Sequence, residues 1–571
     1  MLSLPFRKYP IGLQDFSGLR RDGYIYIDKT SYIYFLAHTG KQYFLSRPRR
    51  FGKSLFLSTL RAYWEGKKDL FEGLSIERLE NSNPEAWEAY PVFYIDFNRD
   101  DFEKPRDLTL KYSNKNDSIK GPGTTKNQGT PSCSPEGILE AATKNQETPI
   151  CSLEGILEAH LEEWEEEYGC RKKEASLAVR FQNLLKTAAE TQGKRCVVLV
   201  DEYDKPLLEA LGDKEREDHY KAVYKGFFSA LKSYEKYLQF VFITGVTKFS
   251  KISIFSDLNQ LEDISFDEDY AGICGITQEE MLGTFASEIH KMAEGLEMTD
   301  DECLKKLKET YDGYRFSSGP TSVYNPHSLL NAFKKRKLGF YWFETGTPTF
   351  LVRKLRELNF DVRKLSDLSL QTTERVLSDY REDNPDPIPL LYQTGYLSIR
   401  DHDRAANIYT LGFPNSEVEY GFLESLMPEY VADSGAGSGK DILSIKRYLE
   451  TGDLGRLRDA LTALFAGIPY TKQEDPFENY FQSVIYIVFT LLGQYVQCEV
   501  HSFQGRADCI VETKKYVYLF EFKRDATAKE ALKQIEDKGY ALVYQADTRT
   551  LYRVGAGFDS KNRMLTDWEV Y

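Results

Sequence analysis

The sequence predicts a multidomain α/β protein in which a parallel sheet covered by helices is followed by a mainly helical middle and a small C-terminal α/β domain. Short apolar runs alternate with amphipathic helical stretches up to about residue 270, and a second group of strand patterns lies near the end of the chain. The length of 571 residues exceeds what one hydrophobic core supports. We therefore expect domain boundaries that give the segments 1–275, 276–385, 386–465 and 466–571.

Short runs rich in β-branched and aromatic residues form the expected N-terminal sheet: Tyr43–Leu45, Val92–Phe97, Cys196–Val200 and Phe240–Thr244. Helical patterns separate these runs, and strands joined by helical crossovers pair in parallel. Because the runs are almost wholly apolar, both faces of the sheet should be covered.

An internal duplication interrupts this pattern. Residues 125–142 and 143–160 are similar copies that share Thr-Lys-Asn-Gln and Glu-Gly-Ile-Leu-Glu-Ala. Two copies are too few for a solenoid, which needs at least about three stacked units. We expect the second copy to run into a helix over Leu153–Tyr168, and the first to belong to a mobile polar insertion at about 104–142 without a catalytic role.

The middle of the chain is expected to be mainly helical from Thr277 to Asp383. Strand patterns at Gly395–Ile399 and Asn407–Leu411 then precede another helix. This later segment has two interpretations, a winged-helix-like adaptor and an ordinary spacer, and the pattern does not separate them. The Gly- and Ser-rich stretch Asp433–Lys440 is expected to be a flexible break.

The last domain has a helix–strand–strand–strand–helix–strand pattern. A helix is expected over Phe477–Tyr495, then a hairpin with its turn at Gln504-Gly505, then a strand over Tyr516–Lys523. Thr527 and Glu530 have the spacing of a capping box, which marks the start of the next helix. Edge strands are expected near the end of the chain, at Leu551–Val554 and Met564–Tyr571.

Composition and charge narrow the class of protein. Hydrophobic residues make up 41% and charged residues 28%, as in an ordinary globular chain, and the net charge is −14. An acidic average argues against indiscriminate coating of nucleic acid but leaves room for a local basic groove. The 8 Cys form no CxxC pair, so neither a zinc site nor a disulfide framework is expected. Without a signal peptide or a membrane span, a cytoplasmic location is expected.

The strongest single motif is Arg47-Pro-Arg-Arg-Phe-Gly-Lys-Ser54, which lies between an expected strand and an expected helix. That context is typical of a loop whose backbone N–H groups hold the phosphates of ATP. Lys53 would reach the β- and γ-phosphates, and the Ser54 hydroxyl would bind Mg²⁺. Arg47 stands where such a loop has its first Gly, so the turn must be made differently. The residues expected to bind the nucleotide are Arg49, Arg50, Phe51, Gly52, Lys53, Ser54 and Leu55.

A second motif, Cys196-Val-Val-Leu-Val-Asp-Glu202, places two carboxylates at the end of an apolar strand. Asp201 would hold the Mg²⁺ of the nucleotide, and Glu202 would polarise the attacking water. Thr244 or Thr247, at the end of the next strand, would sense the γ-phosphate. Each motif alone can be a helix cap or a strand-end carboxylate pair, whereas the two together favour an ATPase.

Three charged residues of the last domain form another candidate site. Glu521 and Lys523, two apart on a strand, share one face, and Asp508 lies on the neighbouring strand of the hairpin. Asp508 and Glu521 would bind Mg²⁺ for phosphodiester hydrolysis, and Lys523 would orient water or neutralise developing charge. The alternative is a surface Glu–Lys pair on an edge strand. Further candidates are Glu478 and Glu499 as metal ligands and Gln534 as a supporting residue.

These motifs together resemble a known family, the predicted AAA-ATPase-like proteins with a C-terminal PD-(D/E)XK nuclease domain. The resemblance rests on Pro10–Phe16, Tyr26–Lys29, Ser46–Ser54, Val200–Asp204, Thr345–Pro348, Tyr392–Tyr396, Phe413–Val418, Gly505–Asp508 and Glu521–Lys523. It implies an AAA-like P-loop domain, a helical lid-like region and a restriction-endonuclease-like α/β domain, with ATP and Mg²⁺ as cofactors. It also implies that Arg47 is the family's own pattern.

Two functions fit these residues. In the first, the ATP state gates cleavage of nucleic acid, with DNA favoured over RNA and with Glu202, Asp508, Glu521 and Lys523 as catalytic residues. In the second, ATP drives a switch or an assembly step, and the nuclease-like domain only binds nucleic acid or a partner. The complete triad favours the first function, and the acidic average favours the second. Whether the chain forms an oligomer stays open.

Some residues near these motifs have two interpretations. Tyr26, Asp28 and Lys29 precede the phosphate loop, so they either line the nucleotide pocket or form a structural turn. Arg315 is a candidate arginine finger, and its alternative is a structural ion pair.

Overall fold

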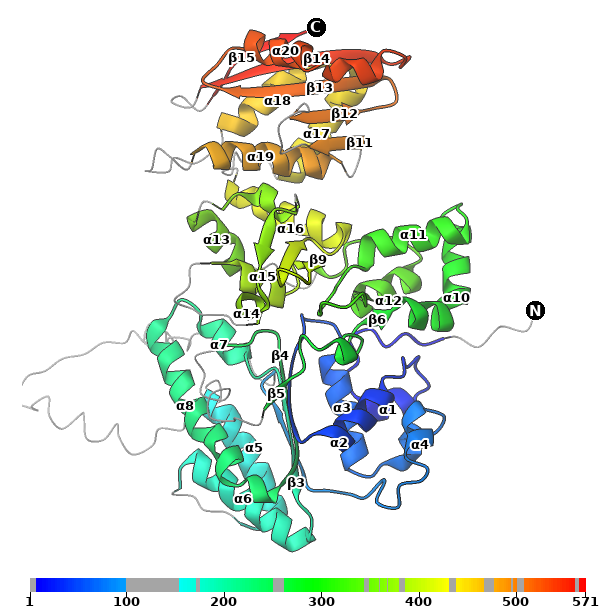
Figure 1. Cartoon of the computed structure of the whole chain (residues 1–571), viewed down its shortest axis with the longest axis vertical. Helices are drawn as coiled ribbons and strands as arrows, with labels where there is room; N and C mark the ends of the chain where they lie inside the picture. The colour runs from blue at the N-terminus through cyan, green and yellow to red at the C-terminus, as the bar shows by residue number, and fades with distance from the viewer. Residues whose placement is uncertain are drawn as a thin grey trace, which may run out of the picture.

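The fold is given by a computed structural model, which describes residues 7–98, 153–170, 175–249, 261–343, 349–358, 360–366, 368–378, 386–430, 438–466, 477–493, 497–500, 508–559 and 564–571. The N-terminal sheet lies at one end of the long axis and the C-terminal sheet at the other, with helices and a small sheet between them (Figure 1). The multidomain α/β prediction is confirmed.

The N-terminal region is a five-stranded parallel sheet. Its spatial order is β2 (Val92–Asp96), β3 (Cys196–Asp201), β4 (Leu238–Gly245), β1 (Gln42–Ser46) and β5 (Glu262–Asp263). All four predicted runs are strands. β5 has no strand signal in the sequence because its two residues are acidic, and it pairs with β1 at the sheet edge. Since β4 separates β3 from β1, the carboxylates that end β3 face the phosphate loop across one intervening strand.

Helices cover both faces of this sheet, as its apolar strands require (Figure 1). One group consists of α1 (Phe16–Arg21), α2 (Thr30–Thr39), α3 (Lys53–Trp64) and α4 (Ser75–Leu79). The group on the other side consists of α5 (Leu153–Tyr168), α6 (Leu177–Gln192), α7 (Lys205–Ala210) and α8 (Lys214–Ser233).

The second copy of the duplicated sequence runs into α5, as predicted, whereas the first copy lies outside the described residues. Leu153 and His160 of α5 are buried, and the first copy has Pro135 and Ala142 at the corresponding positions. The His160 ring stacks on Trp164 with centroids 5.4 Å apart, and its Nε2 accepts the Asp96 backbone N–H at 3.3 Å. The copy that runs into α5 therefore carries the side chains which the core requires.

The middle region begins with helices around a core of their own. These are α10 (Gln278–Gly295), α11 (Asp300–Tyr311) and α12 (Pro326–Lys335), with the short strands β6 (Ile276–Thr277) and β7 (Val323–Tyr324) beside them. Capping boxes start α10 and α11, from Thr277 to Glu280 and from Thr299 to Glu302. The predicted helical character of this region is confirmed.

A small antiparallel sheet follows, in the order β8 (Leu370–Thr372), β10 (Ile408–Gly412) and β9 (Ser398–Asp403). Around it lie α13 (Thr349–Glu357), the 3-10 helix η7 (Val362–Leu365), α14 (Glu374–Leu377), α15 (Ile388–Gln393) and α16 (Ser416–Tyr430). Next come α17 (Ser438–Thr451) and α18 (Leu454–Ala466). The flexible break expected at Asp433–Lys440 is wrong at its end, because α17 already begins at Ser438; residues 431–437 lie outside the described residues.

The C-terminal domain is a mixed five-stranded sheet that follows α19 (Phe477–Leu492). Its order is β11 (Gln497–Val500), β12 (Cys509–Glu512), β13 (Tyr516–Arg524), β14 (Thr550–Asp559) and β15 (Met564–Val570). The crossover helix α20 (Ala528–Asp537) joins the parallel strands β13 and β14, and its predicted capping box of Thr527 and Glu530 is present. The predicted turn at Gln504-Gly505 lies outside the described residues.

One strand prediction in this domain is wrong. Leu551–Val554 was expected at an edge, but β14 lies between β13 and β15. Gly555 and Gly557 look weak for an inner strand, yet a Cβ at Gly555 would lie 2.3 Å from the Ala528 carbonyl oxygen. These glycines therefore let the start of α20 approach the β14 backbone closely.

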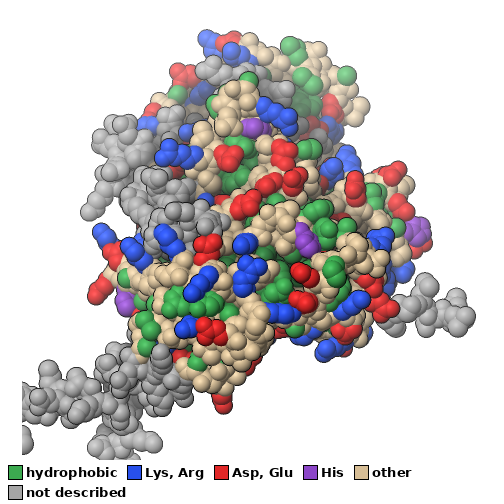
Figure 2. All heavy atoms as spheres, turned by 60° about the horizontal axis from the view of Figure 1, so that its bottom comes forward, with side chains coloured by type: hydrophobic (Ala, Val, Ile, Leu, Met, Phe, Trp, Pro, Cys, Tyr) green, Lys and Arg blue, Asp and Glu red, His purple; other side chains and the backbone are tan. Residues whose placement is uncertain are grey.

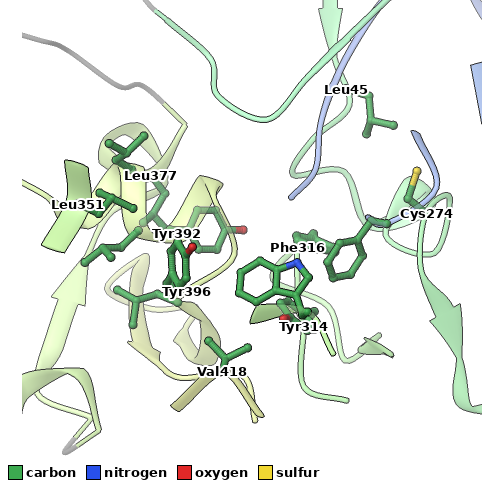
Figure 3. Close-up of a cluster of buried hydrophobic side chains, with 14 of the residues drawn as sticks. Leu45, Cys274, Tyr314, Phe316, Leu351, Leu377, Tyr392, Tyr396 and Val418 are labelled. Atoms are coloured by element: carbon green, nitrogen blue, oxygen red, sulfur yellow. The ribbon is translucent and has the colours of Figure 1, made fainter. Parts of the chain in front are cut away.

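A continuous hydrophobic core joins the three regions. In Figure 3, Leu45 and Cys274 of the N-terminal region lie in one cluster with Tyr314, Phe316, Tyr392 and Tyr396 of the middle. On the face shown in Figure 2, Lys and Arg side chains are intermixed with Asp and Glu, in line with the acidic average. Among the described residues no helix is both long enough and apolar enough to span a membrane.

Candidate active sites

The phosphate loop connects the end of β1 to the start of α3. Gly52, the N-cap residue of α3, has a φ of 95°, and no side chain caps the helix. The start of a helix thus faces the loop with its N–H groups available for phosphate oxygens. The Lys53 ammonium lies inside the loop and donates to the carbonyl oxygens of Arg47 at 2.9 Å and Pro48 at 3.0 Å. A nucleotide would give this ammonium stronger acceptors.

Arg47 replaces the first Gly of the loop with a buried anchor. Its guanidinium donates to the carbonyl oxygens of Ser46 at 2.9 Å, Ser265 at 2.8 Å and Tyr270 at 3.1 Å. It also lies over the Phe316 ring, 4.3 Å from the centroid. The side chain is 1% exposed, so Arg47 fixes the loop backbone from the protein interior.

The carboxylates expected to serve the nucleotide lie at the carboxyl end of β3. Asp201 accepts hydrogen bonds from Thr244 Oγ1 at 2.8 Å and from the Tyr94 hydroxyl at 3.3 Å. Glu202 has a φ of 50°, a left-handed backbone that non-glycine residues adopt at a cost of about 1–2 kcal/mol. Burial raises the pKa of the Glu202 carboxyl, and the Lys53 ammonium opposes this shift.

The neighbouring threonines differ in role. Thr244 is fully buried and bonded to Asp201, which suits a residue that links γ-phosphate and metal. Thr247 instead donates its backbone N–H to Asp204 Oδ2 at 2.6 Å, and its carbonyl accepts the Tyr203 hydroxyl. Burial raises the pKa of Asp204 to about 6; this carboxyl lies after β3 and accepts the backbone N–H groups of the turn after β4.

The other loop residues contribute mostly through their backbone. Phe51 is buried against Tyr314, with ring centroids 4.7 Å apart, and Leu55 is half-buried on α3. The Arg49 and Arg50 side chains are exposed. Arg49 lies near enough to Glu202 to lower the pKa of that carboxyl, whereas the guanidinium of Arg50 contacts the His327 ring at 3.1 Å.

The middle region packs on the phosphate loop through Trp342 and Gly395 and on the segment after β4 through Gln393, three residues that we call the loop clamp. Trp342 Nε1 donates to the Arg49 carbonyl at 3.3 Å, and Gln393 Oε1 accepts the Lys248 backbone N–H at 2.9 Å. A Cβ at Gly395 would lie 2.7 Å from Pro48 Cβ. The motif Tyr392–Tyr396 was visible in the sequence, but only the fold assigns it this contact.

Residues with two sequence interpretations take structural positions. Asp28 accepts the backbone N–H groups of Thr30 at 2.9 Å and Ser75 at 2.7 Å, and Lys29 is paired with Glu280 at 2.6 Å. The Tyr26 hydroxyl contacts Thr59 Oγ1 at 3.4 Å. Arg315 donates to backbone carbonyls, including that of Arg400 at 3.0 Å, so it holds the small sheet.

The C-terminal triad converges at one end of the sheet. The Asp508 backbone N–H points to Glu521 Oε2 at 3.4 Å, and Asp508 Oδ2 accepts the Phe522 N–H at 2.8 Å. Lys523 Nζ donates to Glu521 Oε1 at 2.9 Å and to Gln534 Oε1 of α20 at 2.7 Å. Glu521 is fully buried, which excludes the alternative of an exposed surface pair. Gln534 therefore supports the site from the helix.

This carboxylate pair fits a divalent cation. Burial and then the charge of Glu521 raise the pKa of Asp508 to about 6, against the Phe522 N–H, Lys523 and Arg363. A buried and a half-buried carboxylate beside one ammonium leave negative charge that a bound Mg²⁺ would neutralise. Glu478 and Glu499 lie on α19 and β11, and their side chains are outside the described part of the structure.

Comparisons with known proteins agree with this architecture. The predicted AAA-ATPase family model matches residues 10–151 and 138–255, and the PD-(D/E)XK nuclease superfamily model matches residues 476–568. A protein of Azotobacter chroococcum mcd 1, named "Uncharacterized protein in vnfD 5'region", is 34% identical over 576 residues that cover 99% of each chain. The chain belongs to the predicted AAA-ATPase-like family. No solved structure matches it.

The family match divides at the duplication. The two matched segments overlap at residues 138–151, inside the duplicated sequence.

Some residues of the AAA-ATPase-like sites have no clear signal in the sequence. Tyr94 precedes β3 by more than a hundred residues but bonds Asp201, because β2 and β3 pair with Asp96 opposite Asp201. Trp342 reaches the loop from the far end of the helical region. Only the paired strands and packed helices bring these residues to the loop.

Proposed function

We propose that this protein is an ATP-binding and ATP-hydrolysing nuclease in which the nucleotide state of the phosphate loop gates Mg²⁺-dependent cleavage of nucleic acid. The observation that carries the proposal is the convergence of the half-buried Asp508 and Lys523 on the fully buried Glu521, with Gln534 bonded to the lysine. A module that only binds nucleic acid has no use for a carboxylate pair locked to a lysine.

At the nuclease site, Asp508 and Glu521 would hold the metal. Bound Mg²⁺ would supply an activated water and neutralise charge on the scissile phosphate. Glu521 holds Lys523 in place, and Gln534 accepts a second hydrogen bond from the same ammonium. A lysine ammonium has three N–H donors, so one remains beyond these two bonds to hold the attacking water.

At the nucleotide site, Lys53 would leave the loop carbonyls for the β- and γ-phosphates, while Ser54 and Asp201 would hold the metal of the nucleotide. Thr244 fixes the orientation of Asp201 through a 2.8 Å bond. The raised pKa of Glu202 suits a carboxylate that orients the attacking water and accepts its proton.

The test compares cleavage by the wild type, Lys53→Ala, Glu521→Gln and the control Glu530→Gln. Labelled single-stranded DNA, duplex DNA and RNA are incubated with Mg²⁺, with and without ATP. Glu530 is an exposed capping residue of α20, and Gln also serves at that position. We expect cleavage of DNA by the wild type and Glu530→Gln, none by Glu521→Gln, and loss of the ATP dependence in Lys53→Ala.

The loop clamp supports a second candidate, a nucleotide-driven switch whose nuclease-like domain binds nucleic acid or a partner without cutting. In that case none of the proteins cleaves any of the three substrates, while ATP hydrolysis persists in the wild type and stops in Lys53→Ala. Cleavage that does not depend on ATP and that only Glu521→Gln abolishes would support the nuclease function and contradict the gating by ATP.

A further inference from the structure

The 3-10 helix η7 belongs to the middle region, outside residues 476–568 matched by the nuclease model. Its Val362 and Leu365 side chains are fully buried, and it packs on α19 of the C-terminal domain. Phe489 of α19 in turn packs on Phe522, the neighbour of Glu521, with ring centroids 5.8 Å apart. Ser366, directly after η7, contacts the Tyr486 hydroxyl of α19 and donates to Glu419 Oε1 at 2.9 Å. These contacts fix η7 against the nuclease domain.

Arg363 on η7 is held in one orientation by Asp361. Its Nε donates to Asp361 Oδ1 at 2.8 Å and its Nη2 to Asp361 Oδ2 at 2.7 Å, while the side chain is 21% exposed. Its charge reaches the nuclease site, because it is among the groups that lower the pKa of Asp508. The next residue, Lys364, is exposed, so η7 carries a second cation beside the Asp361–Arg363 pair.

Such cations meet a need of the site. A phosphodiester that approaches Asp508 and Glu521 is repelled by two carboxylates, and Lys523 is already engaged with one of them. An oriented guanidinium binds phosphate oxygens with little loss of side-chain entropy. A local cationic edge would also reconcile nucleic-acid binding with the net charge of −14.

We propose that Arg363 and Lys364 bind a backbone phosphate of the nucleic acid next to the scissile bond, so that the middle region completes the nuclease site. This inference rests on the proposed nuclease function. The phosphate contact carries no sequence information, so it would position DNA of any sequence.

The test measures binding of a fluorescein-labelled duplex DNA with single-stranded tails, in a Glu521→Gln background that prevents cleavage. Dissociation constants are determined for Arg363→Ala, Arg363→Lys and Lys364→Glu over a series of NaCl concentrations. Loss of one phosphate contact should flatten the slope of log K against log salt by about 0.9 and weaken binding several-fold. Arg363→Lys should restore part of the affinity.

Arg549→Ala is the matched control. Asp547 and Arg549 form the same Asp-x-Arg pair, with Nε to Oδ1 at 3.0 Å and Nη2 to Oδ2 at 2.6 Å, and Arg549 is 25% exposed. Arg549 directly precedes β14 at Thr550, which pairs with Tyr516, so it lies at the opposite end of the sheet from Lys523. Its removal should leave the salt slope unchanged.

The outcomes separate the two proposals. If the parent protein binds DNA and the wild type cleaves it, but Arg363→Ala and Lys364→Glu keep the parent slope and affinity, the phosphate contact is wrong and the nuclease stands. If the wild type neither binds nor cleaves, the nuclease function itself fails. Lys364→Glu alters an exposed side chain, so it tests the contact even if Arg363→Ala does not fold.

Discussion

Gly395→Ala tests whether the middle region sets the shape of the phosphate loop. Gly395 has a φ of 89°, and a Cβ there would lie 2.7 Å from Pro48 Cβ and 2.8 Å from Pro48 Cγ. Pro48 also provides the carbonyl that accepts the Lys53 ammonium at 3.0 Å. The substitution must therefore displace the clamp, the loop or both.

The magnitude follows from two terms. A left-handed backbone costs a non-glycine residue about 1–2 kcal/mol. The contact with the rigid Pro48 ring adds about 1–3 kcal/mol of overpacking. Gly212 has a φ of 92° with nothing within 4 Å of its Cβ, so Gly212→Ala reports the backbone term alone. We expect a loss of about 2–5 kcal/mol for Gly395→Ala and about 1–2 kcal/mol for Gly212→Ala.

Denaturant titration measures the two losses in unfolding free energy, and a fluorescent ATP analogue measures nucleotide affinity. A loop displacement worth about 1.4 kcal/mol weakens binding tenfold, which we expect for Gly395→Ala and not for Gly212→Ala. Equal losses of stability in the two variants, with the same nucleotide affinity as the wild type, would refute the reasoning.

Three further predictions concern single groups. Thr244→Val removes the hydroxyl that donates to Asp201, so the rate of ATP hydrolysis should fall about tenfold or more while ATP affinity changes little. Steady-state kinetics measures the rate and ligand titration measures the affinity; an unchanged kcat contradicts this prediction. Arg47→Gly restores the usual loop residue but leaves a cavity where the buried side chain was. It should therefore lower the free energy of unfolding by about 3 kcal/mol or more, and a rise in Tm would disprove the anchoring role. Burial raises the pKa of Asp508 to about 6, so the free energy of unfolding without metal should decrease as pH rises towards and through 6. Mg²⁺ should therefore raise Tm more at a pH well above 6 than at a pH below it. Equal Mg²⁺-induced shifts of Tm, or the same pH dependence in Asp508→Asn, would contradict this.

Features with a local cause were predictable from the sequence. The strand runs of the N-terminal sheet and the strand Tyr516–Lys523 follow from short runs rich in apolar, β-branched and aromatic residues, and the capping box of Thr527 follows from a fixed spacing. The convergence of Asp508 with Glu521 was accessible for the same reason, because a short hairpin sets its own register.

Features that arise from packing between distant segments were not predictable. The inner position of β14 depends on α20 lying against Gly555, which no local pattern records. Arg47 reads as a defect in the loop motif until Ser265 and Tyr270 supply its acceptors. Arg363 lies more than a hundred residues before the nuclease domain that it approaches, so only the packing of η7 on α19 reveals it.

The middle region contacts both the phosphate loop and the C-terminal domain, and this arrangement gives a nucleotide gate a physical path. Gly395 contacts the phosphate loop, and Ser366 contacts α19, while the backbone of Phe413 donates to the Leu365 carbonyl at 3.3 Å between them. A ligand shifts a conformational equilibrium only through interactions that differ between the two states. The Lys53 bonds to the loop carbonyls are such an interaction, because phosphates compete for the same ammonium. If the loop passes this change to Gly395, then Gly395→Ala should uncouple cleavage from ATP while the Asp508–Glu521–Lys523 group stays intact, which a defect in the nuclease site cannot mimic.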